Sequence, residues 1–264
     1  MLVRTWNLFH GNATPPERRA FLDVMVKLAA ADRPDVLCLQ ELPEWALPQL
    51  GAWSGMTAFG DVAQRTRMGL IPAPAEVGRV VTGANHGLLR SAFSGQANAI
   101  LVGAELTPVE HRSLRLNPWS FRRRFDVGLV SQVAWAREAR SCQVVRARRG
   151  DGTVVIANLH GTSWRDKRLA DAELLRAATF VDGFAEPGEP VVLAGDFNLT
   201  VRNSETIPTL TDREWGFEGP TPAGIDHVLV RNTAGGPPTR WPLERRRVDG
   251  RVLSDHAPVE REVA

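Results

Sequence analysis

The chain of 264 residues contains no tyrosine, only two lysines and only two cysteines. Two cysteines make no disulfide framework in a chain of this length, and Cys38 and Cys142 lie in apolar, strand-like stretches, so we expect buried free thiols. No apolar run is long enough to span a membrane. Leu2 and Val3 lead directly into a strand, without the basic and apolar regions of a secretory signal. These absences predict a cytoplasmic protein with no transmembrane segment.

A surplus of one charge is also missing, since 32 basic residues face 30 acidic ones and the formal net charge is +2. No overall field therefore demands a polyanionic partner. The hydrophobic fraction of 43% and the charged fraction of 23% are ordinary for a soluble globular protein. We expect one domain over residues 1–264, and a monomer. The basic residues are almost all arginine, which coding preference alone would explain, although arginine also favours bidentate phosphate contacts.

Apolar runs and helical spacing predict an α/β protein with more strands than helices. Local hairpins mix with helix-crossed units, so a mixed sheet is favoured over a parallel one, and two packed sheets with helices outside would bury this many strands. Residues 78–93 and 108–124 lack periodicity and are predicted to be irregular loops, either contacting substrate or solvated. The expected strands are 2–6, 35–40, 98–102, 127–135 paired with 142–147, 154–158, 191–194, 225–231 and 259–263; the expected helices are 17–31, 45–50 and 166–184.

Six short polar clusters each adjoin one of the apolar runs. Strand tips of α/β proteins are where ligands and catalytic groups collect, so we expect the six clusters to meet at one point. Carboxylates, amides and imidazoles together suit a hard metal ion and a phosphoryl group, which points to hydrolysis of a phosphate ester. The clusters are Thr5-Trp6-Asn7, Leu39-Gln40-Glu41, Asn158-Leu159-His160, Gly195-Asp196-Phe197-Asn198, Ile225-Asp226-His227 and Ser254-Asp255-His256.

Asp196 and Asn198 are two residues apart, so their side chains leave an extended chain on the same face. A carboxylate beside an amide can hold a water molecule and take its proton, although an Asx turn after a strand would use the same residues. Glu41 leaves a buried strand, where an acid is costly unless it is paired or bound to metal. With Asn7 and Asp255 nearby it would form a weak Mg²⁺ site; a surface acid is the alternative.

Two histidines are candidates for proton transfer or for stabilising the transition state, because imidazole titrates near neutrality. His256 follows Asp255, and Asp226 is the expected carboxylate partner that would hold its tautomer. His160 follows Asn158 by two positions. Taken singly, either histidine could equally be a satisfied imidazole of the core or surface.

Taken together and in this order, the clusters resemble the endonuclease/exonuclease/phosphatase superfamily over residues 3–259. The resemblance implies a four-layer α-β-β-α sandwich of two mixed β-sheets flanked by helices, and hydrolysis of phosphodiester bonds that depends on Mg²⁺ or Mn²⁺. It makes Glu41 the chief metal ligand, with Asn7 and Asp255. Asp196 and Asn198 would activate the attacking water. Asp226 would orient His256, which stabilises the phosphoryl charge or acts as acid or base.

One position indicates a branch of this family. The abasic-site repair enzymes carry a tyrosine-containing segment where this chain has His160, and here the chain is similar to pancreatic-type deoxyribonucleases and neutral sphingomyelinases. The resemblance implies that His160 acts as a general acid on the side of the leaving group.

The substrate is open between three hypotheses. A nuclease is favoured first, since Trp119, Arg122 and Arg123 lie in one loop-like segment suited to phosphate contact and base stacking. A phosphodiesterase or phosphatase for a lipid headgroup, inositol phosphate or other small phosphoester is the alternative, and tryptophans exposed near the site would favour it. A non-catalytic binding module is disfavoured because no expected catalytic group is missing. The candidate tryptophans are Trp45, Trp53, Trp119 and Trp164.

Overall fold

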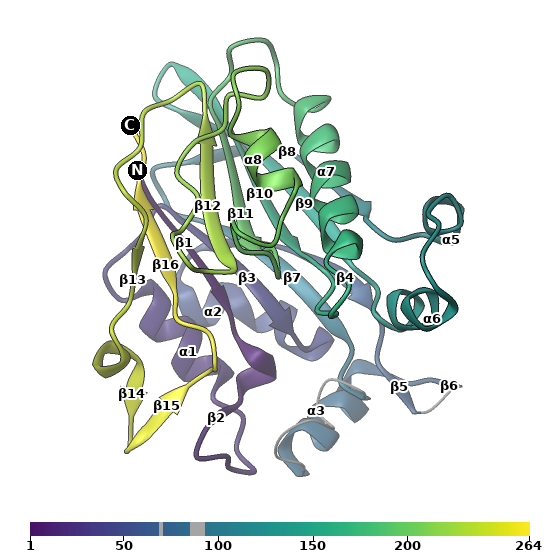
Figure 1. The fold of residues 1–264 in the computed structure, drawn as a ribbon. Helices are drawn as coiled ribbons and strands as arrows, with labels where there is room; N and C mark the ends of the chain where they lie inside the picture. The colour runs from purple at the N-terminus through teal and green to yellow at the C-terminus, as the bar shows by residue number, and fades with distance from the viewer. Residues whose placement is uncertain (69–70, 85–92) are drawn as a thin grey trace.

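Two mixed β-sheets lie face to face in the computed structural model, which describes residues 1–68, 71–84 and 93–264 (Figure 1). The first has the strand order β13-β16-β1-β3-β7-β4 and the second the order β12-β11-β10-β9-β8. The strands of the first sheet are β1 (Leu2–Asn7), β3 (Val36–Leu42), β4 (Thr57–Gln64), β7 (Gln96–Val102), β13 (Thr239–Arg240) and β16 (Val259–Glu262). Those of the second are β8 (Thr107–Arg115), β9 (Ser141–Arg149), β10 (Gly152–His160), β11 (Val191–Asp196) and β12 (Asp226–Arg231).

Helices cover the outer face of each sheet. On the first sheet, α1 (Leu22–Ala30) and α2 (Leu50–Ser54) bury residues such as Met25 and Leu50 against Leu37 and Leu101 of the strands. On the second, α7 (Arg168–Asp182) and α8 (Thr206–Leu210) pack on the strands in the same way. Small branched side chains from both sheets fill the layer between them. The four-layer α-β-β-α sandwich expected from the resemblance is therefore confirmed.

Strand register brings four strand ends to one edge of the sandwich. β1 runs parallel to β3, pairing Asn7 with Gln40, and β10 runs parallel to β11, pairing His160 with Asp196. Gln40 crosses between the sheets, where its Nε2 donates to Asn158 Oδ1 at 2.7 Å, and Asn158 Nδ2 donates back to the Leu39 carbonyl at 3.0 Å. These buried bonds fix the ends of the two sheets against each other directly beneath the polar clusters.

The strand predicted at 127–135 is wrong, because Leu129–Arg137 forms helix α6. Its predicted partner β9 already pairs with β8 on one side and β10 on the other, so no edge is left for another strand. The loop predicted at 108–124 is also largely wrong. β8 occupies its first half, and its outward polar side chains hid the strand pattern; α5 (Trp119–Arg122) follows.

The remaining elements are short. In the segment predicted as a loop at 78–93, helix α3 (Ala75–Ala84) covers the first part, while 85–92 lie outside the described residues. Cys38 and Cys142 are buried free thiols, as expected. None of the helices in the described ranges has both the length and the apolarity needed to cross a membrane. The other short elements are β2 (Ala13–Thr14), β5 (Arg67–Met68), β6 (Ile71–Pro72), β14 (Arg247–Val248), β15 (Arg251–Leu253), and the 3₁₀ turns Phe9–Gly11, Glu44–Gln49 and Leu243–Arg246.

Candidate active site

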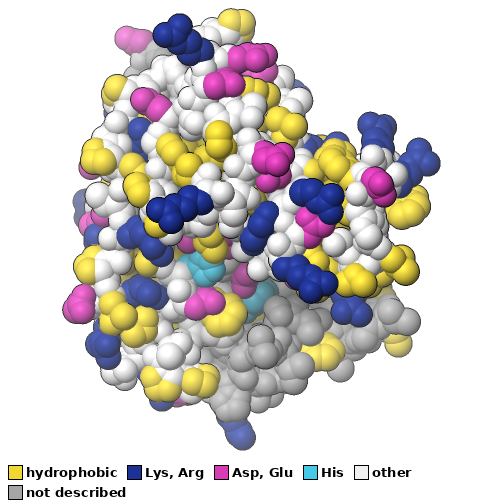
Figure 2. Space-filling view, viewed as in Figure 1, with side chains coloured by type: hydrophobic (Ala, Val, Ile, Leu, Met, Phe, Trp, Pro, Cys, Tyr) yellow, Lys and Arg dark blue, Asp and Glu magenta, His cyan; other side chains and the backbone are white. Residues whose placement is uncertain are grey.

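Asp196, at the end of β11, is the centre of the polar site. Its side chain is 1% exposed, and three groups from other strands and loops converge on its Oδ2 atom. Asn7 Nδ2 donates to Oδ2 at 2.9 Å, His160 Nε2 lies 3.6 Å from it, and His256 Nε2 lies 3.8 Å from it. Figure 2 shows histidine side chains at the bottom of a hollow in this face of the molecule. Residues from four of the predicted polar clusters therefore lie together in the structure.

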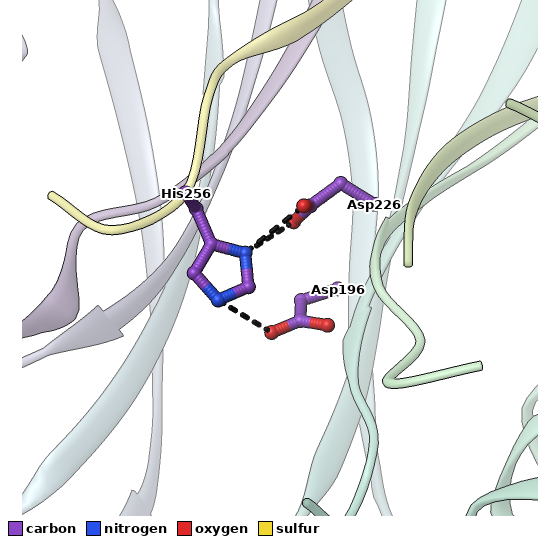
Figure 3. A group of neighbouring side chains, drawn as sticks. All are labelled: Asp196, Asp226 and His256. Carbon is purple, nitrogen blue, oxygen red and sulfur yellow. Dashed lines mark hydrogen bonds and ion pairs between the residues drawn. The ribbon is translucent and has the colours of Figure 1, made fainter. Parts of the chain in front are cut away.

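His256 is held between two carboxylates (Figure 3). Its Nδ1 lies 2.9 and 3.1 Å from the two oxygens of Asp226, so Nδ1 carries a proton and Nε2 faces Asp196. Burial lowers the pKa of His256, but the hydrogen bond to Asp226 and the charges of Asp226, Asp196 and Asp255 outweigh it and raise the pKa to about 10. With this pKa the ring is an imidazolium at neutral pH, the form that can stabilise anionic charge.

Burial removes the solvation of the Asp196 carboxylate, and together with the charge of Asp226 it raises the pKa of Asp196 to about 7; His256 and Asn7 act in the opposite direction. A carboxyl that titrates near neutrality suits a general base. Asn198 lies beside it: its backbone N–H donates to Asp196 Oδ1 at 2.9 Å, and its Nδ2 donates to the Gly161 carbonyl at 3.0 Å. The backbone bond is the Asx turn that the sequence analysis gave as the alternative, and the amide is held by the residue after β10, so the role of the pair in water activation stays a prediction.

Asn7 links Asp196 to Glu41. Its Nδ2 donates to Glu41 Oε1 at 3.1 Å as well as to Asp196, while its Oδ1 accepts the Phe9 N–H at 2.9 Å. The amide oxygen, the atom that a metal would require, is therefore turned away from the two carboxylates. In this arrangement Asn7 positions Glu41 and Asp196 side by side.

His160 is buried, with 1% of its side chain exposed, and two donors reach its Nδ1 atom. Gln96 Nε2 lies 3.1 Å from Nδ1 and an Arg140 NH1 nitrogen lies 2.9 Å from it. The same Arg140 nitrogen lies 3.2 Å from Nε2, and Nε2 faces Glu41 Oε1 and Asp196 Oδ2 at 3.6 Å each. Burial, with the charges of Arg140 and other cations, holds the pKa of His160 well below its ordinary value, so the ring is neutral.

Backbone strain concentrates at this site. Non-glycine residues rarely take a positive φ, and they cost free energy where they do. Glu41 (φ 53°), Asn198 (φ 54°) and His10 (φ 50°) all adopt it, and Glu41 lies at an irregularity in the pairing of β3 with β7. Gly195, at φ 139°, leaves no room for a Cβ, which would lie 2.0 Å from the Leu159 carbonyl oxygen. The strain turns these side chains away from the strand direction and into the hollow.

Four predicted residues make no hydrogen bond or ion pair with this centre within the described ranges. Asp255 is exposed beside His256 and accepts from Ser254 Oγ at 3.4 Å, so its metal role stays a prediction. Arg122 donates to the Asn117 carbonyl at 3.0 Å and thereby holds its own turn, while Arg123 and Trp119, 67% exposed, reach solvent. The other candidate tryptophans are partly buried: Trp45, Trp53 and Trp164.

The oxygen donors of the site fit a hard divalent cation. Glu41 and Asp196 present carboxylates that share one amide donor, and both face the neutral ring of His160, so they offer adjacent oxygen ligands to a hard cation. A second candidate group is Asp196, Asp226 and His256, whose ligand atoms lie within 4.8 Å of one another among the described residues. Because His256 Nδ1 is already bonded to Asp226, this group suits proton transfer better than Mg²⁺.

Three further residues were missed by sequence reasoning. His10 is buried, and its Nε2 lies 3.6 Å from Glu41 Oε2. In the sequence, its position three residues after Asn7 is the feature that could have indicated a place in the site. Gln96 begins β7, and Arg140 precedes β9 with no motif around it. His227 is structural, since its Nδ1 accepts from the Thr221 N–H at 3.0 Å.

Comparison with known proteins agrees with this geometry. The model of the endonuclease/exonuclease/phosphatase family matches residues 5–256. The chain belongs to this family. Its members are hydrolases that act on phosphoester bonds and generally depend on divalent metals, so the family assigns general phosphoester hydrolysis and leaves the substrate open.

Solved structures of this family share the fold at low sequence identity. The endonuclease/exonuclease/phosphatase from Bacteroides vulgatus has a TM-score of 0.69 at 14% identity, covering 100% of this chain and 98% of that one. The Bacteroides thetaiotaomicron mannosyl-6-phosphatase has a TM-score of 0.66 at 16% identity, covering 100% and 99%. Truncated Caenorhabditis elegans TDP2 has a TM-score of 0.60 at 16% identity, covering 99% and 96%. No curated protein sequence matches the chain.

Proposed function

We propose that the protein is a Mg²⁺- or Mn²⁺-dependent phosphodiesterase that cleaves nucleic acid by in-line attack of an activated water. The observation that carries the proposal is the convergence of Asn7, His160 and His256 on one oxygen of Asp196. Asp196 can accept the proton of an attacking water, and the imidazolium of His256 beside it can neutralise the negative charge that develops on the phosphoryl group.

Each residue has a place in the mechanism. Asp196 accepts the proton of the attacking water, which Asn198 helps to orient. His256, kept charged by Asp226, neutralises charge on the phosphoryl oxygens. His160 faces the reacting groups through Nε2 and donates a hydrogen bond to a substrate oxygen. The general-acid role that the family resemblance implied would need a charged ring, whereas burial and nearby cations hold the pKa of His160 well below its ordinary value.

A divalent cation held by Glu41 would polarise the phosphoryl group as a Lewis acid. Asp255, which adjoins His256 in the chain, is the candidate second ligand. Asn7 contributes by positioning Glu41.

The proposal is tested by a screen with Mg²⁺ and Mn²⁺ over plasmid DNA, RNA, bis-p-nitrophenyl phosphate, p-nitrophenyl phosphate and phospholipid, with Asp196→Ala in parallel. We expect cleavage of nucleic acid and of the diester, lost in the variant and on chelation. Turnover of the monoester alone, or nucleic acid cleavage equal in both proteins, refutes it.

One observation favours a lipid phosphodiester as the second candidate. α6 exposes Leu129 at 80%, Val130 at 62% and Val133 at 46%, an aliphatic face that cannot stack on bases. The face adjoins Trp164 and residues 162–163, which come two and three residues after His160. Turnover of phospholipid in vesicles without cleavage of nucleic acid would select this candidate.

A further inference from the structure

Four arginines line a cavity beside the candidate site. The cavity has a volume of about 540 Å³ and lies between β4–β5 and the segment from β8 to α6. Its lining includes no aspartate or glutamate, and its charged members are Arg65, Arg67, Arg115 and Arg137. A cavity of this size accommodates a small ligand or part of a larger one.

The cavity adjoins the residues that hold His160. Gln64 lines the cavity and pairs across the sheet with Gln96, whose Nε2 lies 3.1 Å from His160 Nδ1. Paired residues on adjacent strands lie about 5 Å apart. Ala139 also lines the cavity, and the next residue, Arg140, contacts the same ring nitrogen. The cavity is thus separated from the catalytic hollow by the width of a strand.

These four arginines differ from Arg4 and Arg146 in having no ion-pair partner among the described residues. Inside the sandwich, cations are paired: Arg4 with Asp32 and Glu260, and Arg146 with Glu189. None of the four cavity arginines forms an ion pair with any residue in the described ranges, and all four side chains are exposed. Several guanidinium groups around one cavity attract an anion, and their forked donors match phosphate.

We propose that this cavity binds a second phosphate of the substrate, namely the phosphate adjacent to the scissile one in a nucleic acid strand. The inference rests on the proposed function, because the first phosphate is placed at Asp196. A strand carries a phosphate at every nucleotide, so a strand seated in the hollow brings further phosphates to its flanks. A substrate with a single phosphate leaves the four arginines without a ligand.

A pair of chromogenic substrates tests the inference by kinetics. Thymidine 5′-(p-nitrophenyl phosphate) has one phosphate, and the same compound with a 3′-phosphate has two. We expect kcat/KM to be at least about tenfold higher for the second compound, a preference that Arg115→Gln/Arg137→Gln reduces to roughly one. Arg148→Gln/Arg213→Gln removes the same charge far from the site and should keep the full preference. Equal rates for the two compounds in the native protein, or a preference that survives in Arg115→Gln/Arg137→Gln, overturns the inference.

Equilibrium binding separates this inference from the proposed function. Anisotropy of a labelled short oligothymidylate, with metal chelated, reports binding whether or not the protein turns over substrate. We expect at least about tenfold weaker binding for Arg115→Gln/Arg137→Gln than for the charge-matched control, with a salt slope shallower by roughly one to two. Identical affinities contradict the inference, even in an active enzyme. Binding of inositol hexakisphosphate without binding of the oligonucleotide contradicts the assignment to nucleic acid.

Discussion

The strand ends and the arm formed by α5 and α6 (residues 119–137) differ in burial. At the strand ends, Asn7, Asp196 and His160 are buried and in contact with one another, and their neighbours Glu41 and Asn198 have strained backbone. The arm, which projects beside α7 in Figure 1, exposes Trp119, Leu129 and Val130. Rigid strands therefore hold the groups to which we assign the chemistry, whereas the exposed apolar surface of the arm is carried by short helices.

The largest expected effect is at the strand ends. Asp196→Ala should lower kcat by about 10³- to 10⁴-fold on every substrate, because it removes the general base. Turnover of bis-p-nitrophenyl phosphate and of an oligonucleotide checks this, with Asp182→Asn as a control on the surface. If one of the two substrates kept its rate, the chemistry would not be confined to the strand ends.

His256→Ala should reduce kcat by roughly 10²- to 10³-fold, because the imidazolium that faces Asp196 is lost. Thermal unfolding should shift little, as the ring is partly exposed. Stopped-assay rates and a melting curve measure the two effects. A large loss of stability with normal kcat in the folded fraction would make the histidine structural.

Glu41→Gln should raise the Mg²⁺ concentration for half-maximal activity by about tenfold, because a neutral amide binds a hard cation more weakly than a carboxylate does. Metal titration of the initial rate measures it. An unchanged midpoint would remove Glu41 from the metal site.

Glu173 joins the two regions, since it accepts hydrogen bonds from Trp135 of α6 and from Thr162 beside the site. Burial raises its pKa from 4.5 to about 7. Between pH 4.5 and about pH 7 the Glu173 carboxyl is deprotonated in the unfolded chain and protonated in the native protein. The free energy of unfolding therefore falls as the pH rises through this range, and it stops falling above about pH 7.

Glu173→Gln should abolish this fall, so that the difference in unfolding free energy between variant and native protein changes by about 3 kcal/mol from pH 4.5 to pH 8. Urea denaturation at several pH values measures it. Parallel curves would show that Glu173 does not change its ionisation on unfolding.

The smallest effect on chemistry is expected in the arm. Leu129→Ser/Val133→Ser should leave turnover of bis-p-nitrophenyl phosphate within about twofold, because exposed side chains away from the hollow do not touch the reacting groups. Sedimentation with anionic vesicles shows whether the same change weakens membrane binding. A loss of diester turnover of more than about tenfold would mean that the arm takes part in catalysis.

The sequence predicted the strand ends better than the arm, for a physical reason. Buried strands need continuous apolar runs, so the polar groups after them, such as Asp196 and Glu41, stand out. The sequence of the arm is not constrained by burial, because its apolar face is exposed. Its apolar residues fit the pattern of a strand as well as that of a helix. Contacts between distant segments, such as Arg140 with His160, follow from sheet register and leave no local pattern.

The convergence on Asp196 is tested most directly by a double-mutant cycle of Asp196→Ala and His256→Ala, with kcat measured on a phosphodiester in saturating Mg²⁺. If both groups act on one reacting phosphoryl group, the double variant should lose about as much activity as the worse single variant. Losses that multiply would show that the two residues act independently, and would contradict a single shared site.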